Sequence, residues 1–102
     1  MHGDRSQSPD LSGARFEESD LEGANLWDAN LRGAVFVGTG LRRANLEGAD
    51  LRGAYLADAD LSGADLEGAD LEGTILSPEM IAKFAKELSA AKNLDKIVLE
   101  AQ

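Results

Sequence analysis

Large apolar residues recur along most of this chain with a period of five. From residue 11 to residue 76 one stands at every fifth position, usually with Ala two residues before it. Asp or Asn often directly precedes it, and Gly often follows two residues later. The central positions are Leu11, Phe16, Leu21, Leu26, Leu31, Phe36, Leu41, Leu46, Leu51, Leu56, Leu61, Leu66, Leu71 and Leu76. An internal repeat this regular has to be interpreted before any local feature.

A period of five does not fit a single helix or a single strand. On an α-helix each step of five residues turns the side chain by about 140°, so the apolar residues would spiral round the cylinder. On one long strand an odd step would place successive apolar residues on opposite faces. Within one repeat, however, Ala and Leu lie two apart and share a face of a short strand, and the following Gly accepts the positive φ of a corner. The pattern predicts a solenoid with every Ala and Leu inside.

The motif A-(D/N)-L-x-G, written three times in ADLSGADLEGADLEG at residues 59–73, resembles the repeats of the pentapeptide-repeat proteins. The resemblance covers residues 11–76 and implies an all-β solenoid, a right-handed quadrilateral parallel β-helix with four repeats in each coil. Right-handedness agrees with the general rule for parallel crossovers. The fourteen repeats would then make about three and a half coils. Four repeats depart from the motif at the Gly position, with Glu18, Asp28, Arg43 and Asp58.

The composition divides the chain into three segments. Residues 1–10 are a polar N-terminal tail, residues 11–76 form the β-helix, and residues 77–102 predict a short C-terminal α-helical cap. Ser77, Pro78 and Glu79 are typical of a helix start. The apolar positions that follow are Ile81, Phe84, Leu88, Leu94, Ile97 and Val98. They either cap the core or form a dimer interface, since the resemblance extends to family members that pair through their C-terminal ends.

Sorting the repeats into groups of four gathers the outward apolar residues on one face. Three faces carry mostly Asp or Asn before the central residue, whereas the fourth carries apolar side chains. The candidate partner-binding residues on this fourth face are Val35, Val37, Tyr55, Ala57 and Ile75. Exposed apolar patches usually indicate a partner or a covering element. The C-terminal helix could cover the patch, a second copy or another protein could bind it, or it could be plain surface.

The acidic residues belong to the repeats. The net charge is −9, and residues 11–76 hold 13 Asp and Glu residues against five Arg residues, which argues against direct nucleic-acid binding. The acidic-surface candidates are Asp50, Asp60, Asp65, Glu67, Asp70 and Glu72. Short acidic side chains can simply bond to backbone amides in turns. The resemblance also implies an alternative, mimicry of DNA, although a column of about 17 Å spans only about half a DNA turn.

Catalysis, cofactor binding and metal binding are not expected. The chain has no Cys, and its single His is His2 in the tail, so no His-based acid–base pair can form in the folded part. Asp50 and Asp70 would stack one coil apart and could share Ca²⁺, but Arg32 and Arg52 lie beside them and no further ligands are evident.

The sequence also lacks a signal peptide and a long apolar run, so a cytoplasmic location without membrane binding is expected. The first hypothesis is a non-catalytic protein-interaction or scaffold module that binds a protein partner or itself as a homodimer. The alternative is a DNA-mimicking inhibitor of DNA gyrase or another type II topoisomerase.

Overall fold

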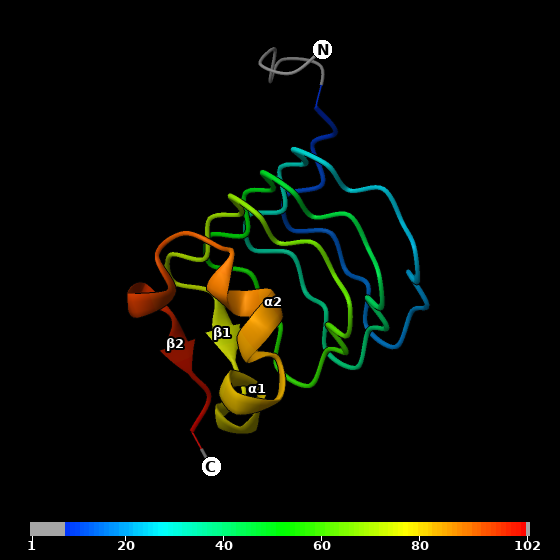
Figure 1. Ribbon diagram of the computed structural model, residues 1–102. Coiled ribbons are helices and arrows are strands. Elements are labelled where there is room, and N and C mark those ends of the chain that lie inside the picture. The colour runs from blue at the N-terminus through cyan, green and yellow to red at the C-terminus, as the bar shows by residue number, and fades with distance from the viewer. Residues whose placement is uncertain (1–7, 102) are drawn as a thin grey trace.

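The computed structural model describes residues 8–101, so most of the predicted tail, including His2, lies outside the described residues. The chain winds into stacked coils and ends in a segment with helices and a strand at one end of the column (Figure 1). The elements are β1 (Ile75–Leu76), α1 (Pro78–Lys83), α2 (Ala85–Ser89), the 3-10 helix η2 (Leu94–Lys96) and β2 (Val98–Leu99). Most of the coil is held by isolated bridges, because each side of a coil is too short for a longer strand.

Parallel bridges stack the repeats in four ladders. Each bridge within the repeats joins residues 20 apart, as a coil of four pentapeptides requires. The ladders are Asp10, Asn30, Asp50 and Asp70; Arg15, Val35, Tyr55 and Ile75; Asp20, Gly40 and Asp60; and Asn25, Asn45 and Asp65. The predicted sorting of the repeats into four faces is therefore confirmed.

Asp and Asn residues shape the turn in each repeat. The side-chain oxygen of Asp20, for example, accepts a hydrogen bond from the amide of Glu22 at 3.0 Å. The same bond to the amide two residues later is made by Asp10, Asp20, Asn25, Asn30, Asn45, Asp50, Asp60, Asp65 and Asp70. Every Asp or Asn that directly precedes the central residue of a repeat makes this bond. The local turn role predicted for these residues is therefore confirmed.

The corner that follows keeps one backbone conformation whichever residue occupies it. Nine Gly residues there have φ between 67° and 72°. The four departures from the motif, Glu18, Asp28, Arg43 and Asp58, have φ between 56° and 65°. An L-residue in this left-handed region costs about 1–2 kcal/mol, and the stacked neighbours must supply that energy.

The Ala and Leu residues form one continuous core. From Leu31 to Leu76 every central residue is at most 1% exposed. Phe16 and Phe36 stack with their ring centroids 5.2 Å apart. Thr39 and Thr74 replace Ala in this core, and each hydroxyl donates to a backbone carbonyl of the preceding coil at 2.6 Å, so burial leaves no polar group unpaired at these two sites.

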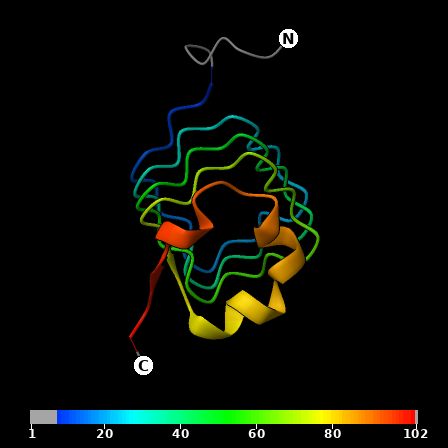
Figure 2. The same ribbon diagram turned by 60° about the vertical axis from the view of Figure 1, so that its left-hand side comes forward.

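The C-terminal segment follows the path of one further coil. The amides of Gly68, Leu71 and Gly73 donate to the carbonyls of Ala90, Lys92 and Lys96, and β2 pairs in parallel with β1. Val98 lies opposite Ile75 at a spacing of 23 residues instead of 20. Helices α1 and α2 take the place of two sides of the coil, as the nearly end-on view shows (Figure 2).

The helices turn their apolar side chains into the solenoid. Met80, Phe84 and Leu88 are at most 3% exposed and belong to the same buried cluster as the Leu residues of the repeats. One part of the predicted helical segment is wrong, because residues 94–99 form η2 and the strand β2. Asn93 turns the chain at φ 63°, and β-branched Ile97 and Val98 are suited to pairing with the open ladder beside them.

Removing the Phe84 ring will measure how strongly this segment is joined to the column. We expect Phe84→Ala to lower the free energy of unfolding by about 3–5 kcal/mol, because the ring leaves a cavity in a sealed core. Chemical denaturation followed by circular dichroism measures the change. The control is Lys86→Ala, an exposed position on α2, which we expect to change it by less than about 0.5 kcal/mol. Equal effects from the two variants would contradict this assignment.

Candidate interaction surface

One ladder carries the outward apolar side chains, and we call it the Val35 face. It consists of Arg15, Val35, Tyr55 and Ile75, and β2 extends it with Val98. Val35, Tyr55 and Ile75 are half-buried, and Val98 is 49% exposed. The other three ladders present mainly Asp and Asn at the equivalent positions. At the position before the central residue, the apolar side chains of the repeats thus all lie on a single ladder.

The predicted patch on this face is smaller than the sequence indicated. Val37 is half-buried and borders it, but Ala57 is only 1% exposed and does not contribute surface. Ala57 lies in the stacking register between Val37 and Ser77, and its methyl group is too short to reach beyond its neighbours. The prediction of Ala57 as a partner-binding residue is therefore wrong.

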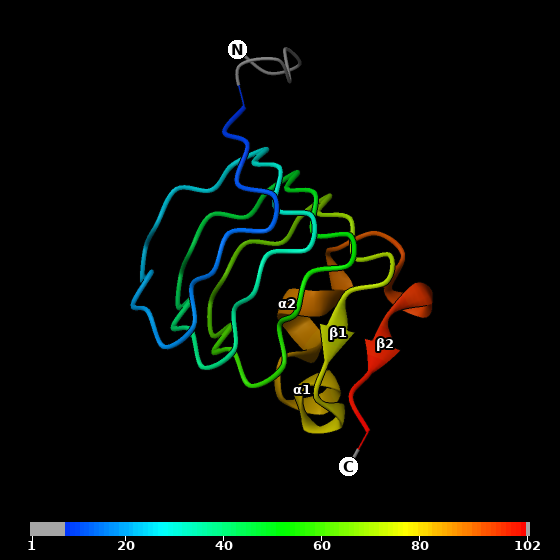
Figure 3. The same ribbon diagram turned by 180° about the vertical axis from the view of Figure 1, so that it is seen from behind.

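The C-terminal helices do not cover the Val35 face. Their buried side chains point into the core, and the face gains only the strand β2 at its end, where Figure 3 shows β2 beside β1 as the outermost strand. Tyr55 is tied to this strand, since its hydroxyl donates a hydrogen bond to the carboxylate of Glu100. This bond raises the pKa of Tyr55 above its usual value of 10, because ionisation would place a phenolate against a carboxylate.

The C-terminal candidates separate into buried and accessible residues. Phe84 and Leu88 are 3% and 1% exposed, so the predicted use of these two in a dimer interface is contradicted. Ile81, Leu94 and Ile97 are partly buried against the core. Val98 remains accessible, and Leu99, which the sequence analysis did not select, is 51% exposed. The signal for Leu99 was the short run of branched residues at 97–99, which predicts an extended strand better than a helix.

The acidic candidates do not form one surface. They are spread over three ladders and their adjoining corners, and several are engaged by cations or amides. Asp50 is 7% exposed and accepts hydrogen bonds from Arg32 Nε at 2.6 Å and Arg52 Nη2 at 2.9 Å. The Asn93 amide donates to Asp70 at 2.8 Å and lowers the pKa of that carboxyl.

The remaining acidic candidates differ in how far they are engaged. Asp60 bonds to the Ser62 hydroxyl, which lowers its pKa, and lies 3.6 Å from Arg42. Asp65, Glu67 and Glu72 are exposed. Six separate carboxylates of this kind do not present a continuous negative strip.

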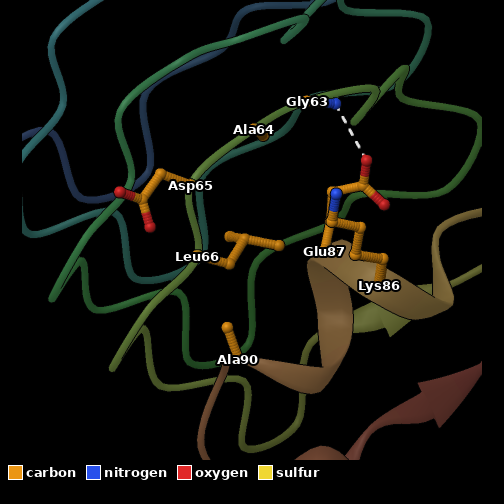
Figure 4. A pocket seen from close by; sticks show the side chains of 7 residues that line it. All are labelled: Gly63, Ala64, Asp65, Leu66, Lys86, Glu87 and Ala90. Atoms are coloured by element: carbon orange, nitrogen blue, oxygen red, sulfur yellow. Dashed lines mark hydrogen bonds between the residues drawn. The ribbon is translucent and has the colours of Figure 1, made fainter.

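A cavity of about 200 Å³ lies between α2 and the repeats, with Asp65 and Lys86 in its wall (Figure 4). Glu87 accepts a hydrogen bond from the Gly63 amide at 2.9 Å and so joins α2 to a corner. Within residues 8–101 no three His, Cys, Asp or Glu side chains are placed to hold a metal ion. None of the helices in that range is long and apolar enough to cross a membrane.

The Tyr55–Glu100 contact can be tested by titration, because Tyr55 is the single tyrosine of the chain. We expect phenolate absorbance to appear at a pH above the usual tyrosine range, and Glu100→Gln to move the pKa back toward 10. Since the folded pKa is raised, the stability from this contact is present below pH 10 and is lost as pH rises through the folded value. Glu87→Gln, which removes a carboxylate from another side of the column, should leave the titration unchanged.

The repeats match a known family model. The model described as pentapeptide repeats matches residues 10–48 and 41–77, so it covers more than half of the chain. No curated protein was found as a relative.

Solved structures of similar proteins share the fold. The crystal structure of the pentapeptide-repeat protein Rfr23 from the cyanobacterium Cyanothece 51142 is 32% identical, with a TM-score of 0.58 over 89% of this chain and 60% of that one. HetL from the cyanobacterium Nostoc sp. strain PCC 7120, which is involved in heterocyst differentiation regulation, is 28% identical, with a TM-score of 0.50 over 91% of this chain and 47% of HetL.

A third structure is more distant. QnrB1, a plasmid-mediated fluoroquinolone resistance protein, is 23% identical over 80% of this chain and 41% of QnrB1, and its TM-score of 0.38 is too low to support an argument about function. This chain spans less than two thirds of the length of each of these proteins. Together with the four ladders and the repeated turn bonds, the family model establishes that the chain belongs to the pentapeptide-repeat family, whose fold is the right-handed quadrilateral β-helix.

Proposed function

We propose that this chain is a non-catalytic protein-interaction module that binds a partner protein through the Val35 face. The observation that carries the proposal is the concentration of Val35, Tyr55 and Ile75 on one ladder while the other ladders carry Asp and Asn. Contiguous apolar side chains on an otherwise polar surface are typical of interaction sites. Val37 at the border and the exposed Val98 at the end extend the same surface.

The column would present this surface as a rigid platform. In the proposal, about three and a half coils hold the ladder, and residues 77–102 close the C-terminal end with α1 and α2. The bridges fix successive outward side chains at the spacing of neighbouring strands, about 4.8 Å. A partner would therefore meet preorganised side chains and lose little additional conformational entropy on binding.

A second candidate function is inhibition of DNA gyrase by mimicry of DNA. It is favoured by the net charge of −9 and by the 13 acidic residues of the repeats. The local roles of these residues argue for the first candidate, because five of the 13 bond to turn amides and Asp50 lies between two Arg side chains. The five are Asp20, Asp50, Asp60, Asp65 and Asp70. The proposal therefore places partner binding on the Val35 face.

A matched pair of substitutions tests the Val35 face. Val35→Arg introduces one positive charge into the face, and Arg15 in the same ladder shows that the position accepts this side chain. Gly40→Arg introduces the same charge at the equivalent position of another ladder, where a Cβ would meet nothing closer than 3.7 Å. We expect Val35→Arg to weaken partner binding at least about tenfold, the loss of about 1.4 kcal/mol, and Gly40→Arg to leave it within about twofold.

The measurement is quantitative affinity capture on the immobilised wild type and the two variants, followed by titration of any protein retained. A partner that binds the wild type and Gly40→Arg but not Val35→Arg bears out the proposal. If no protein distinguishes the two variants, the Val35 face is not the binding surface.

A gyrase supercoiling assay separates the two candidate functions. We expect no inhibition at micromolar concentration, because the carboxylates are spread over three ladders and partly paired. Inhibition that weakens steeply as salt is raised would favour the mimic, since attraction between exposed charges is screened by ions. In that case Val35→Arg should have no specific effect on inhibition compared with Gly40→Arg.

A further inference from the structure

A second cavity, of about 190 Å³, opens on the side of the column that carries the ladder beginning at Asp10. Its charged lining residues are Arg32, Asp50, Arg52, Asp70 and Lys92. Three of these five are cationic and two are carboxylates, so the wall carries a net charge of +1 in a chain whose net charge is −9. The wall therefore favours an anion as its ligand.

Asp50 holds the two guanidinium groups of this wall in place. Its side chain is 10% exposed, and it accepts hydrogen bonds from Arg32 Nε at 2.6 Å and from Arg52 Nε and Nη2, each at 2.9 Å. Within residues 8–101 the atoms Arg32 Nη1, Arg32 Nη2 and Arg52 Nη1 make no hydrogen bond, so their N–H groups are available as donors to a ligand. Because both groups are positioned beforehand, a ligand has less side-chain entropy to remove.

Asp70 places one hydrogen-bond acceptor beside these donors. Its Oδ1 is occupied, because it accepts hydrogen bonds from the Glu72 amide at 3.1 Å and from Asn93 Nδ2 at 2.8 Å. Its Oδ2 lies 3.8 Å from Arg52 Nε and accepts no hydrogen bond from the described part of the chain. The Asn93 bond lowers the pKa of Asp70, and the charge of Lys92 lowers it further, so the carboxyl is ionised at neutral pH. An ionised carboxylate only accepts hydrogen bonds, so it selects a ligand that can donate one.

We propose that this cavity binds inorganic phosphate. At neutral pH the phosphate ion combines negatively charged oxygens with at least one P–OH group. The charged oxygens accept hydrogen bonds from the free guanidinium N–H groups and from the ammonium of Lys92. The P–OH group donates to Asp70 Oδ2, the one partner in the wall that a fully ionised anion could not satisfy.

This acceptor distinguishes free phosphate from related dianions. Sulfate has no hydrogen to donate at neutral pH, so it would place a negative oxygen against Asp70 Oδ2. A phosphate monoester has its second pKa at about 6, so at pH 8 it has lost that hydrogen as well. The same cavity is therefore unsuited to a phosphoryl group carried by a protein, a lipid or a nucleotide.

Titration of the full ¹⁵N-labelled chain with sodium phosphate, followed by NMR at pH 8 and constant ionic strength, tests the proposal. We expect saturable shifts of the backbone amides of Gly48, Gly68 and Lys92, which line the cavity. We expect sodium sulfate and phenyl phosphate each to bind at least about tenfold more weakly, because both leave Asp70 facing an acceptor.

Arg32→Gln and Arg42→Gln are a matched pair of variants. The two side chains are 56% and 55% exposed, each lies beside an Asp, and each substitution removes one positive charge. We expect Arg32→Gln to weaken phosphate binding at least about tenfold and Arg42→Gln, on another ladder, to leave it within about twofold. Lys92→Gln changes an exposed side chain of the same wall and should also weaken binding. Thermal unfolding monitored by circular dichroism verifies that each variant is folded.

Asp70→Asn tests the selectivity separately from the affinity. Asn30 makes the same turn bond in the same ladder, so Asn at position 70 can keep the turn. We expect the preference for phosphate over sulfate to disappear, because the amide can donate a hydrogen bond to either anion. If Asp70 acted only through its charge, both anions would bind more tightly by the same factor and the preference would remain.

Three results would overturn the proposal. Without saturable shifts at millimolar phosphate, the cavity is not a phosphate site. Equal binding of phosphate and sulfate by the wild type indicates an adventitious ion only. Equal losses in Arg32→Gln and Arg42→Gln indicate that the overall charge, and not the cavity, attracts the anion. The site lies on a different ladder from the Val35 face, so Val35→Arg should leave phosphate binding unchanged and either proposal can fail without the other.

Discussion

The stacking of each repeat on the repeat 20 residues later is the interaction on which the rest of the structure depends. Every bridge brings an amide and a carbonyl of neighbouring coils together, and the inward Leu then lies above the next inward Leu. Corners must keep the same geometry from coil to coil for this register to persist. That is why Glu18, Asp28, Arg43 and Asp58 adopt the positive φ of the Gly residues that they replace.

The same constraint separates stability from function. The inward positions and the turn-forming Asp and Asn residues are fixed by packing and by local hydrogen bonds. Where the residue before the centre is not Asp or Asn, it neither packs in the core nor makes the turn bond. Val35, Gly40, Tyr55 and Ile75 are such residues. On the Val35 face three of these positions are apolar, a choice that the coil itself does not require. This supports the binding surface that we propose on the Val35 face.

Much of the fold could be predicted because one period governs it. Five-residue spacing was enough to identify the core Leu residues and the corners, whereas the four faces followed from the resemblance to the pentapeptide-repeat proteins. The exposure of Ala57 could not be predicted, because it depends on the lengths of the neighbouring side chains. The secondary structure of residues 94–99 could not be predicted either, because a short apolar run can form either a helix or a strand. Here the open edge of β1 decides the outcome, since Val98 and Leu99 pair with it. The ladder that carries the outward apolar residues was therefore predicted, whereas the burial of Ala57 and the strand at the end of that ladder were not.

The end of a solenoid presents a problem that its middle does not have. Each coil leaves four short edges open for the next, and unpaired edges attract other chains. Helices α1 and α2 avoid this on two sides, because a helix in that place presents no strand edge to another chain. On the Val35 face the chain instead forms the strand β2. This strand pairs with the edge of β1 but has an open edge of its own on the other side. Its exposed apolar side chains are Val98 on the outer face and Leu99 on the opposite face, and neither is the charged residue or proline that commonly protects such edges. Within residues 8–101 the apolar ladder thus ends in a strand whose outer edge is neither paired nor blocked.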